Sequence, residues 1–353
     1  MNAPVTEEVQ ADAAPDEPRL TATRPAAGIA KGWIWLAPGA LLNLVGRNVA
    51  LFIFLALVIL ASLFVENFAA LDNAQVILKQ SAIPAIAVIG MTMVLMTGGI
   101  DLSLGYVVGL ASIVSGIMAN TWLWPAPAVL AAILAMGLAL GLCNGLITQF
   151  MRVPAFITTL GTGYVLYGLA QIVSQGSIIN RLPKAFLAIG RTPMLGLPSA
   201  VFLALGVAVV FHLLISRTIF GRQLKAFGFG ARAAVLSGVP GARINVTVYA
   251  LCAALAALSG LLFTVRVNAA QPNMGGGAFT FEVVTAAIVG GTSLFGGVGT
   301  IFGTVIGTIL IGVLLNGLVL MQVSSYIQQI IIGVIIVLAV AFDTFAKSRR
   351  RTG

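Results

Sequence analysis

Two polar side chains that could do chemistry, Asp101 and Ser103, lie in a glycine-bounded break from Gly98 to Gly105, between two apolar runs. Asp101 is the only acid between Asp72 and Glu282. A carboxylate beside membrane-depth sequence is costly, so it needs a partner or a polar cavity. Two roles stay open: capping free backbone N–H groups at the start of a helix, and lining a path across the membrane.

Three more polar residues lie inside apolar runs. Asn144, Thr158 and Asn316 could line a polar, weakly charged path together with Asp101 and Ser103. Hydrogen bonds between neighbouring helices explain the same residues equally well. The sequence therefore predicts a path of five residues without excluding a purely structural role for them.

A second glycine-dense break runs from Gly290 to Gly299. Glycine-rich loops can cradle phosphate, but the Lys-Ser/Thr ending of a P-loop is absent, and the nearest upstream cation is Arg266. A tight re-entrant turn or a discontinuous helix fits better, because membranes tolerate irregular backbone where protein buries it or a cavity lies beside it. Glu282 could cap this break from the outside.

Enzymatic and metal chemistry have little support in the sequence. The single histidine, His212, lies near the end of an apolar run, where an interfacial or packed residue is expected. No nucleophile and base stand in the context of a catalytic triad. Cys143 and Cys252 lie inside apolar runs and are expected to be packing residues. The sequence predicts no catalytic residue, no metal site and no cofactor bound by this chain.

The composition is that of a membrane protein. Of 353 residues, 59% are hydrophobic and 8% are charged, against about 25% charged in a soluble domain. The net charge of +9 comes from cations that lie beside apolar runs, which is where cations that set membrane topology lie. No basic groove for nucleic acid can be traced in the sequence. At about 20 residues per span, we expect an all-α polytopic protein with ten transmembrane helices: Val49–Val65, Val76–Thr97, Leu104–Asn120, Ala126–Phe150, Ala155–Ser174, Ser199–Ile215, Val246–Val265, Val283–Phe295, Thr300–Met321 and Ile327–Phe342.

Lysine and arginine set the expected orientation. With both termini in the cytoplasm, the inside segments hold fourteen Lys and Arg and the outside segments hold five, as the positive-inside rule requires. The segment from Ser216 to Arg243 joins the sixth and seventh runs and carries five cations and no anion. It is either a handle by which a partner outside the membrane moves the protein, or a passive solvated loop that only sets topology.

The chain divides into three parts. Residues 1–46 are rich in Ala, Pro, Thr, Glu and Asp and are expected to form a cytoplasmic, largely disordered segment. Residues 47–345 form the transmembrane domain, with 216–243 as a cytoplasmic loop. Residues 346–353 form a basic cytoplasmic tail.

Small residues suggest close packing and a repeat. Gly137, Gly141 and Gly145 recur at helical spacing, which lets helix backbones approach closely in lipid. The tripeptides Asn144-Gly145-Leu146 and Asn316-Gly317-Leu318 fall on expected spans that run in opposite directions. An inverted repeat would give that result.

Three segments carry a resemblance to a known family. They are Met96-Thr97-Gly98-Gly99-Ile100-Asp101-Leu102-Ser103-Leu104-Gly105, then Gly221-Arg222 through Ser237-Gly238-Val239, and finally Gln271-Pro272-Asn273 followed by Ala287-Ile288-Val289-Gly290-Gly291-Thr292-Ser293-Leu294 and Gly296-Gly297. With them, about residues 48 to 345 resemble the inner-membrane permease subunits of bacterial ATP-binding-cassette (ABC) sugar importers, the ribose/xylose/arabinose/galactose group.

The resemblance implies a fold like that of type II ABC importers, and a function. The chain would be a non-catalytic permease subunit in the bacterial inner (plasma) membrane, forming the translocation path for a sugar or sugar-like solute by alternating access. It would form a homodimer in the membrane lipid. Its partners would be a cytoplasmic ATPase subunit, which binds ATP and Mg²⁺, and a periplasmic solute-binding protein. Pentoses, hexoses and sugar alcohols are all carried by similar-looking permeases.

The family's coupling segment falls on the central basic loop and favours the handle. The residues that the resemblance assigns to ATPase coupling are Gly221, Arg222, Lys225, Gly228, Arg232, Ala233, Ala234, Ser237 and Gly238. One departure lies in Phe229-Gly230-Ala231-Arg232-Ala233-Ala234, where family members usually carry acidic residues before the paired alanines. We expect the ATPase partner to have a correspondingly altered, more acidic surface.

Three alternatives compete with this interpretation. An ion-coupled secondary transporter or facilitator of small polar solutes normally needs buried charges, and almost no ionisable residue beyond Asp101 and His212 lies inside the expected spans. An intramembrane enzyme would need a catalytic constellation that the sequence does not show. A membrane scaffold would use the central loop only to recruit a partner.

Overall fold

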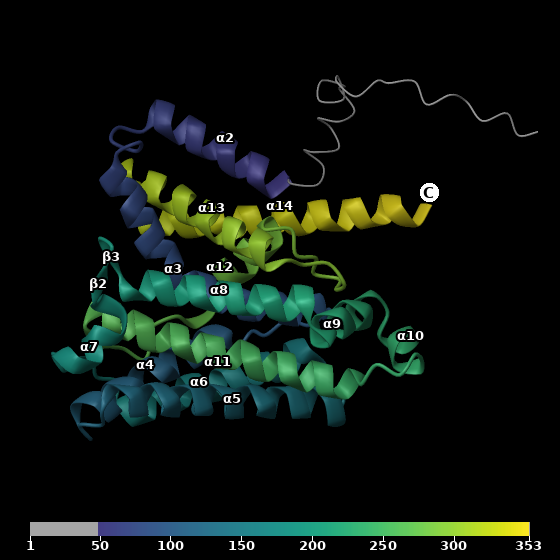
Figure 1. Ribbon diagram of the computed structural model, residues 1–353, viewed down its shortest axis with the longest axis horizontal. Helices are drawn as coiled ribbons and strands as arrows, with labels where there is room; N and C mark the ends of the chain where they lie inside the picture. Colours follow the sequence, from purple (N-terminus) through teal and green to yellow (C-terminus); the bar gives the residue numbers. More distant parts are fainter. Residues whose placement is uncertain (1–48, 353) are drawn as a thin grey trace, which may run out of the picture. The chain divides into compact units, whose positions relative to one another are not determined.

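The computed structural model describes residues 49–352, with side chains from Ala50 to Phe345, and this part of the chain is mostly helical (Figure 1). Its elements are α2 (Val49–Phe64), α3 (Leu71–Met96), α4 (Leu104–Asn120), α5 (Ala126–Phe150), α6 (Ala155–Ser174), β1 (Ile179–Asn180), α7 (Lys184–Arg191), β2 (Pro193–Met194), β3 (Leu197–Pro198), α8 (Ser199–Arg217), α9 (Ile219–Phe229), α10 (Ala231–Leu236), α11 (Gly241–Val267), β4 (Ala269–Ala270), α12 (Gly276–Val289), α13 (Ile301–Leu320) and α14 (Ser325–Thr352). The strands form two short antiparallel pairs, β1 with β4 and β2 with β3.

The structure describes the backbone of only one of the two terminal segments expected from the sequence. The expected N-terminal segment, residues 1–46, lies outside the described residues. The expected basic tail begins at residue 346, which lies inside α14, because that helix continues to Thr352.

Each of the ten expected spans corresponds to a helix, so the prediction of an all-α polytopic membrane protein is confirmed. Seven helices of the described part are long and apolar enough to cross a membrane: α3, α5, α6, α8, α11, α13 and α14. Helices α2, α4 and α12 are apolar but shorter. The 14 residues of α12 extend about 21 Å, less than the roughly 30 Å hydrocarbon core of a bilayer.

The eighth span lies earlier than the sequence predicts. The expected range is Val283–Phe295, whereas α12 covers Gly276–Val289. Gly275 and Gly276 take positive φ angles of 124° and 72°, which turn the chain into the helix. Glu282 therefore lies inside α12 and does not cap the following break.

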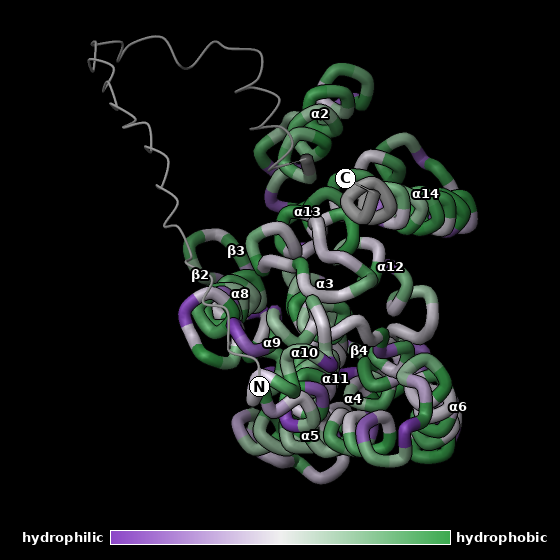
Figure 2. Tube along the Cα trace, turned by 90° about the vertical axis from the view of Figure 1, so that its right-hand side faces the viewer, coloured by the Kyte–Doolittle hydropathy of each residue, from purple (hydrophilic) through white to green (hydrophobic). Residues whose placement is uncertain are grey.

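Helices α3 and α11 form the centre of the fold (Figure 2). In each, 78% of the most apolar window is buried, more than in any other candidate span of the described residues. They run antiparallel, since Ser259 Oγ donates to the Ile83 carbonyl at 3.2 Å while a Cβ on Gly90 would lie 2.9 Å from Cys252 Cα. The glycine stripe of α5 packs against the α11 backbone, which confirms the predicted close packing of Gly137, Gly141 and Gly145.

The order of long helix, break and short helix occurs twice. Helix α3 has 26 residues and is followed by a break and the 17-residue α4. Helix α11 has 27 residues and is followed by a break and the 14-residue α12. Because α3 and α11 are the second and seventh spans and run antiparallel, the two halves have opposite directions, as an inverted repeat would require. Asn144 and Asn316 then lie on the matching fourth and ninth spans.

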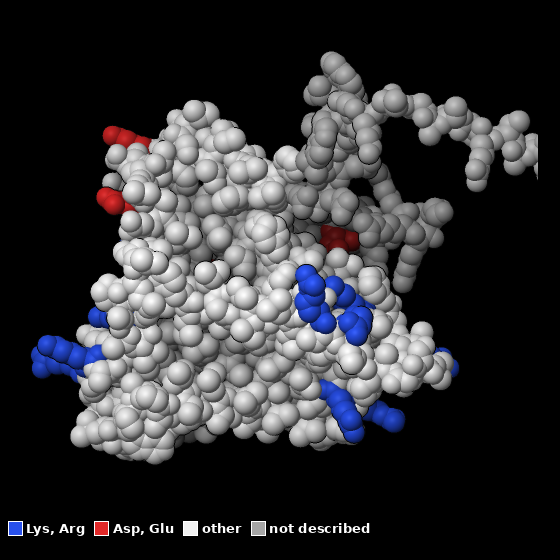
Figure 3. All heavy atoms as spheres, viewed as in Figure 1, with Lys and Arg blue, Asp and Glu red and all other residues white. Residues whose placement is uncertain are grey.

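Charged side chains gather at the two ends of the helices on the face seen in Figure 3, and the belt between them is uncharged. Helices α9 and α10 lie where α3 finishes; we call this the α9–α10 end. Helix α7 and strands β2 and β3 lie at the opposite end, which we call the α7 end (Figure 1). An uncharged belt between two charged ends is the surface that a bilayer requires.

Candidate functional site

Asp101, Ser103 and Asn144 form one buried hydrogen-bonded cluster, which we call the Asp101 group. Asp101 Oδ1 accepts the backbone N–H of Ser103 at 2.9 Å and the Ser103 hydroxyl at 2.5 Å. Asn144 Nδ2 donates to Ser103 Oγ at 2.9 Å. Asp101 and Ser103 have no exposed surface, and Asn144 is 2% exposed. The group ties the break after α3 to α5 and holds the start of α4.

Side chains from two other helices satisfy the backbone of the same break. The Leu102 N–H donates to Thr159 Oγ1 of α6 at 3.0 Å. The Ile100 carbonyl accepts from the Thr159 hydroxyl at 3.4 Å and from the Tyr249 hydroxyl of α11 at 3.5 Å. Unpaired backbone groups are costly at membrane depth, so these contacts allow the helix to be interrupted there.

All five side chains predicted to line the path are buried in the single chain, at 6% exposure or less. Asp101, Ser103 and Asn144 come together, but the other two do not join them. Thr158 Oγ1 and Asn316 Oδ1 have no hydrogen-bond partner among the described residues. Asn316 lies four residues before the end of α13, toward the α7 end. Contact of these five residues with a solute stays a prediction.

Replacing Asp101 tests the structural role of the Asp101 group. We expect Asp101→Ala to destabilise the protein by about 1–3 kcal/mol, because it leaves the buried N–H and hydroxyl of Ser103 without an acceptor. Asp101→Asn keeps an oxygen at Oδ1 and should cost much less. Thermal unfolding of the purified protein in detergent measures both, and equal losses of Tm would contradict the role.

The central basic segment forms two short helices, α9 and α10. Thr218 Oγ1 accepts the Gly221 N–H at 3.4 Å and caps the start of α9. Gly230 separates the two helices, and Gly238, at φ 87°, turns the chain toward α11. The nine residues predicted to couple to an ATPase all lie on α9, on α10 or in the turn after α10.

Three segments meet at Gly228 of α9, in a contact that we call the glycine junction. A Cβ on Gly228 would overlap the Met96 carbonyl oxygen at the end of α3 and the backbone of Gly297. The Gly297 N–H also donates to the Met96 carbonyl at 2.9 Å. Gly296 has a φ of 84°, and a Cβ there would lie 2.8 Å from the Gly228 carbonyl and 3.1 Å from the Gly98 nitrogen. Backbone touches backbone, so a movement of α9 toward its neighbours would push on the end of α3 and on the turn before α13.

The glycine-dense break between α12 and α13 is a tight turn held by the protein's own groups. Asp343 Oδ2 of α14 accepts the Ser293 hydroxyl at 3.0 Å and the Leu294 N–H at 3.1 Å. A phosphate in this turn would have to displace that carboxylate, so a nucleotide site is disfavoured here. The described residues contain no group of three or more His, Cys, Asp or Glu that could hold a metal ion.

Comparison with known families identifies the family of the chain. Residues 73–340 match the family model described as "Branched-chain amino acid transport system / permease component". The chain belongs to this permease family. The matched range runs from α3 into α14 and includes the Asp101 group, both short helices α9 and α10, and the glycine junction.

The relatives of this permease include sugar permeases. "Ribose import permease protein RbsC" of Escherichia coli K12 is 38% identical over 295 residues, which covers 82% of this chain and 91% of the relative. RbsC of Bacillus subtilis strain 168 is 37% identical over 289 residues, covering 81% and 89%. "L-arabinose transport system permease protein AraH" of E. coli K12 is 33% identical over 304 residues, covering 86% and 92%. The predicted resemblance is confirmed. No solved structure gives a match.

The permease exposes large apolar side chains on α9 and α10. Phe229 is 73% exposed, Val235 52% and Leu236 83%. Arg222 and Arg232 are exposed on the same two helices. We call these five residues the hairpin patch. Exposed apolar groups rimmed by charge mark sites where another protein binds.

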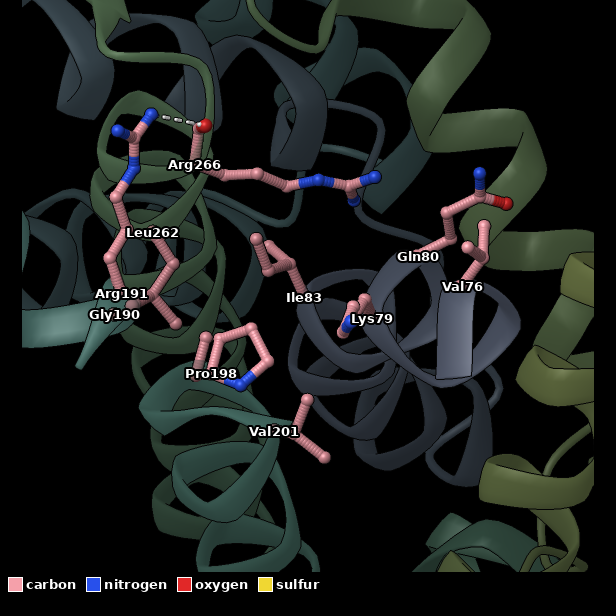
Figure 4. A pocket seen from close by; sticks show the side chains of 11 residues that line it. Val76, Lys79, Gln80, Ile83, Gly190, Arg191, Pro198, Val201, Leu262 and Arg266 are labelled. Atoms are coloured by element: carbon pink, nitrogen blue, oxygen red, sulfur yellow. Dashed lines mark hydrogen bonds between the residues drawn. The ribbon is translucent and has the colours of Figure 1, made fainter. Parts of the chain in front are cut away.

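A cavity of about 290 Å³ lies at the α7 end, between α3, α7, α8 and α11 (Figure 4). Lys79, Arg191 and Arg266 lie around it, and Arg191 Nη2 donates to the Arg266 carbonyl at 2.7 Å. The rest of its wall is largely apolar, and none of its described lining residues is acidic. Apolar walls and cations offer little to a neutral polar solute, so we do not assign this cavity to the path of the permease.

Proposed function

We propose that this permease is the transmembrane subunit of an ABC importer that carries a sugar or sugar-like solute by alternating access. Its similarity to relatives named as ribose and arabinose permeases supports a sugar as cargo. The observation that carries the proposal is the glycine junction. It links a helix that can be reached from outside the membrane to the ends of two spans by direct backbone contact.

We assign the α9–α10 end, and both chain termini with it, to the cytoplasm of a bacterial cell. The cations of the central segment support this orientation through the positive-inside rule: Arg217, Arg222, Lys225, Arg232 and Arg243. The membrane is then the inner (plasma) membrane, the one that a cytoplasmic ATPase can reach. The α7 end faces the periplasm.

The partners follow from this orientation. A separate ATPase subunit, which binds ATP and Mg²⁺, docks on the hairpin patch. A solute-binding protein delivers the sugar at the α7 end, and a second copy of the permease completes the path. This chain forms the translocation path and the helices on which the ATPase docks, and the partner subunit hydrolyses ATP.

The proposed movement starts at α9. When the ATPase dimer closes, it shifts α9, and the glycine junction passes the shift to the end of α3 and to the turn before α13. Helix α3 leads directly into the break that holds the Asp101 group, so α4 follows. The ATPase can favour one arrangement of these spans only by its differential affinity for the two arrangements.

Reconstitution tests the proposal. The permease is placed in liposomes with its ATPase and its solute-binding protein, and uptake of ribose, arabinose and leucine is measured with and without ATP. We expect uptake of a sugar that requires ATP and stimulates its hydrolysis. Uptake of leucine alone would favour the cargo class in the family description.

Two other results would contradict an ABC importer. Uptake that persists without ATP and collapses with an ion gradient would identify a secondary transporter. ATPase binding without uptake of any solute would identify a scaffold.

A further inference from the structure

Three of the five tyrosines of the chain meet on one surface of α4 and α6. The rings of Tyr106 and Tyr164 are stacked, with centroids 6.0 Å apart and an interplanar angle of 29°. Tyr167 meets Tyr106 edge to face, at 6.1 Å and 69°. Gln171 Nε2 donates to Asn273 Oδ1 at 3.0 Å. We call these five residues the tyrosine surface.

The α6 members of the tyrosine surface form one stripe that runs from the middle of the helix toward its end. Tyr164, Tyr167 and Gln171 are spaced by three and four residues, so they lie on one face. Tyr164 is near the centre of the 20-residue α6, about 15 Å from either end. Tyrosines of membrane proteins gather at the bilayer interfaces. At mid-depth a hydroxyl facing lipid would lose its hydrogen bonds to water; Tyr164 is 64% exposed and Tyr167 39%.

The fifth residue, Asn273, comes from irregular backbone that lies against α4 and α6. It lies between β4 and α12, where the chain runs along α4: a Cβ on Gly109 would overlap the Pro272 carbonyl, and one on Gly116 would lie 2.5 Å from Ala270 Cβ. A Cβ on Gly277 would lie 3.5 Å from the Tyr106 hydroxyl oxygen. Irregular backbone with an exposed amide does not face lipid; it is tolerated where protein buries it or water lies beside it.

We propose that the tyrosine surface lines the part of the path that the solute touches, and that it selects neutral sugars. The C–H faces of a sugar ring can pack on tyrosine rings, while its hydroxyls exchange hydrogen bonds with phenol and amide groups. The five side chains are uncharged polar types, so a zwitterionic amino acid would find no oppositely charged partner among them. This inference rests on the proposed import of a sugar.

Thiol accessibility tests the surface without any transport assay. In a Cys143→Ser background, which removes the exposed native thiol, Tyr167→Cys is compared with Leu169→Cys in liposomes. Tyr167 is 39% and Leu169 43% exposed, and residues two apart on a helix point about 200° apart. We expect a membrane-impermeant thiol reagent to label Tyr167→Cys at least about tenfold faster, because a thiol in lipid neither ionises nor meets the reagent. Equal rates would overturn the proposal.

Uptake tests the contact with sugar. The Tyr164→Ala/Tyr167→Ala variant should import about tenfold less sugar per ATP hydrolysed. Tyr164→Phe/Tyr167→Phe should lose less, because it keeps the rings and removes only the hydroxyls, and the control Leu169→Ala should stay within about twofold of the unaltered protein. Unchanged uptake per ATP in the double alanine variant would overturn the proposal. So would equal losses in the phenylalanine and alanine variants, because ring packing would then not matter.

The two tests separate the surface from the function. If the unaltered permease imports no sugar, the proposed function fails. The labelling rates then decide alone whether the tyrosine surface faces water.

Discussion

Gly228→Leu should reduce ATP-driven uptake by about a hundredfold or more, while the permease still inserts into the membrane. This is the largest effect that we expect of any single substitution. A Cβ at this position would overlap the Met96 carbonyl and the Gly297 backbone, and neither backbone group can rotate away as a side chain can. Helix α9 must therefore leave the junction, and the coupling free energy between ATPase and path is lost; typical couplings correspond to 5- to 150-fold effects. Uptake in liposomes with both partners measures the loss.

Gly206→Leu is the matched control. Gly206 lies on α8, and a Cβ added there meets no atom within 4 Å among the described residues. The same change of residue type at this site should leave uptake within about twofold of the unaltered protein, since surface substitutions usually cost little. Full uptake by Gly228→Leu would show that α9 does not work through the junction.

Leu236→Glu should weaken binding of the ATPase by about tenfold or more, the second largest effect. Leu236 is 83% exposed on α10, at the α9–α10 end, and fully burying a leucine side chain contributes about 1.5–3 kcal/mol. Arg232→Glu should act in the same direction, because the expected partner surface is acidic and like charges would face each other. Co-purification of the ATPase at graded concentrations measures both affinities.

The control for this prediction lies at the opposite end. Leu195, between β2 and β3, is 94% exposed, so Leu195→Glu makes the same chemical change on a surface that the ATPase should not touch. Equal weakening by Leu195→Glu and Leu236→Glu would exclude the hairpin patch as the docking site.

The helices could be predicted from the sequence because long apolar runs determine them, but helix α12 could not be placed correctly. The sequence places no span boundary at Gly275 and Gly276, and only their positive φ angles in the structure show that they turn the chain into a helix. The glycine-dense break that follows could be predicted as an interruption, with a tight turn and a discontinuous helix both open. Met96, which contacts this break at the glycine junction, is far away in the sequence, so no local pattern predicts the contact.

The polar residues of the candidate site show the same limit. Asp101 and Ser103 were predictable as a pair because only Leu102 separates them in one break. Thr158 and Thr159 are adjacent, and their sequence does not tell which one faces the break; the structure gives Thr159 the contact with Leu102. The stripe of Tyr164, Tyr167 and Gln171 was missed, although its spacing of three and four residues is a signal that a search for aromatic residues at mid-span would find.

The central claim is that a cytoplasmic ATPase drives the permease through α9 and α10. The side of the membrane on which these two helices lie tests this claim most directly. In the Cys143→Ser background, Ser237→Cys is labelled with a membrane-impermeant thiol reagent in spheroplasts and in inside-out vesicles, with Ser177→Cys at the α7 end as the reference. We predict that Ser237→Cys reacts only in inside-out vesicles and Ser177→Cys only in spheroplasts. Labelling of Ser237→Cys in intact spheroplasts would put the hairpin patch out of reach of a cytoplasmic ATPase and contradict the account.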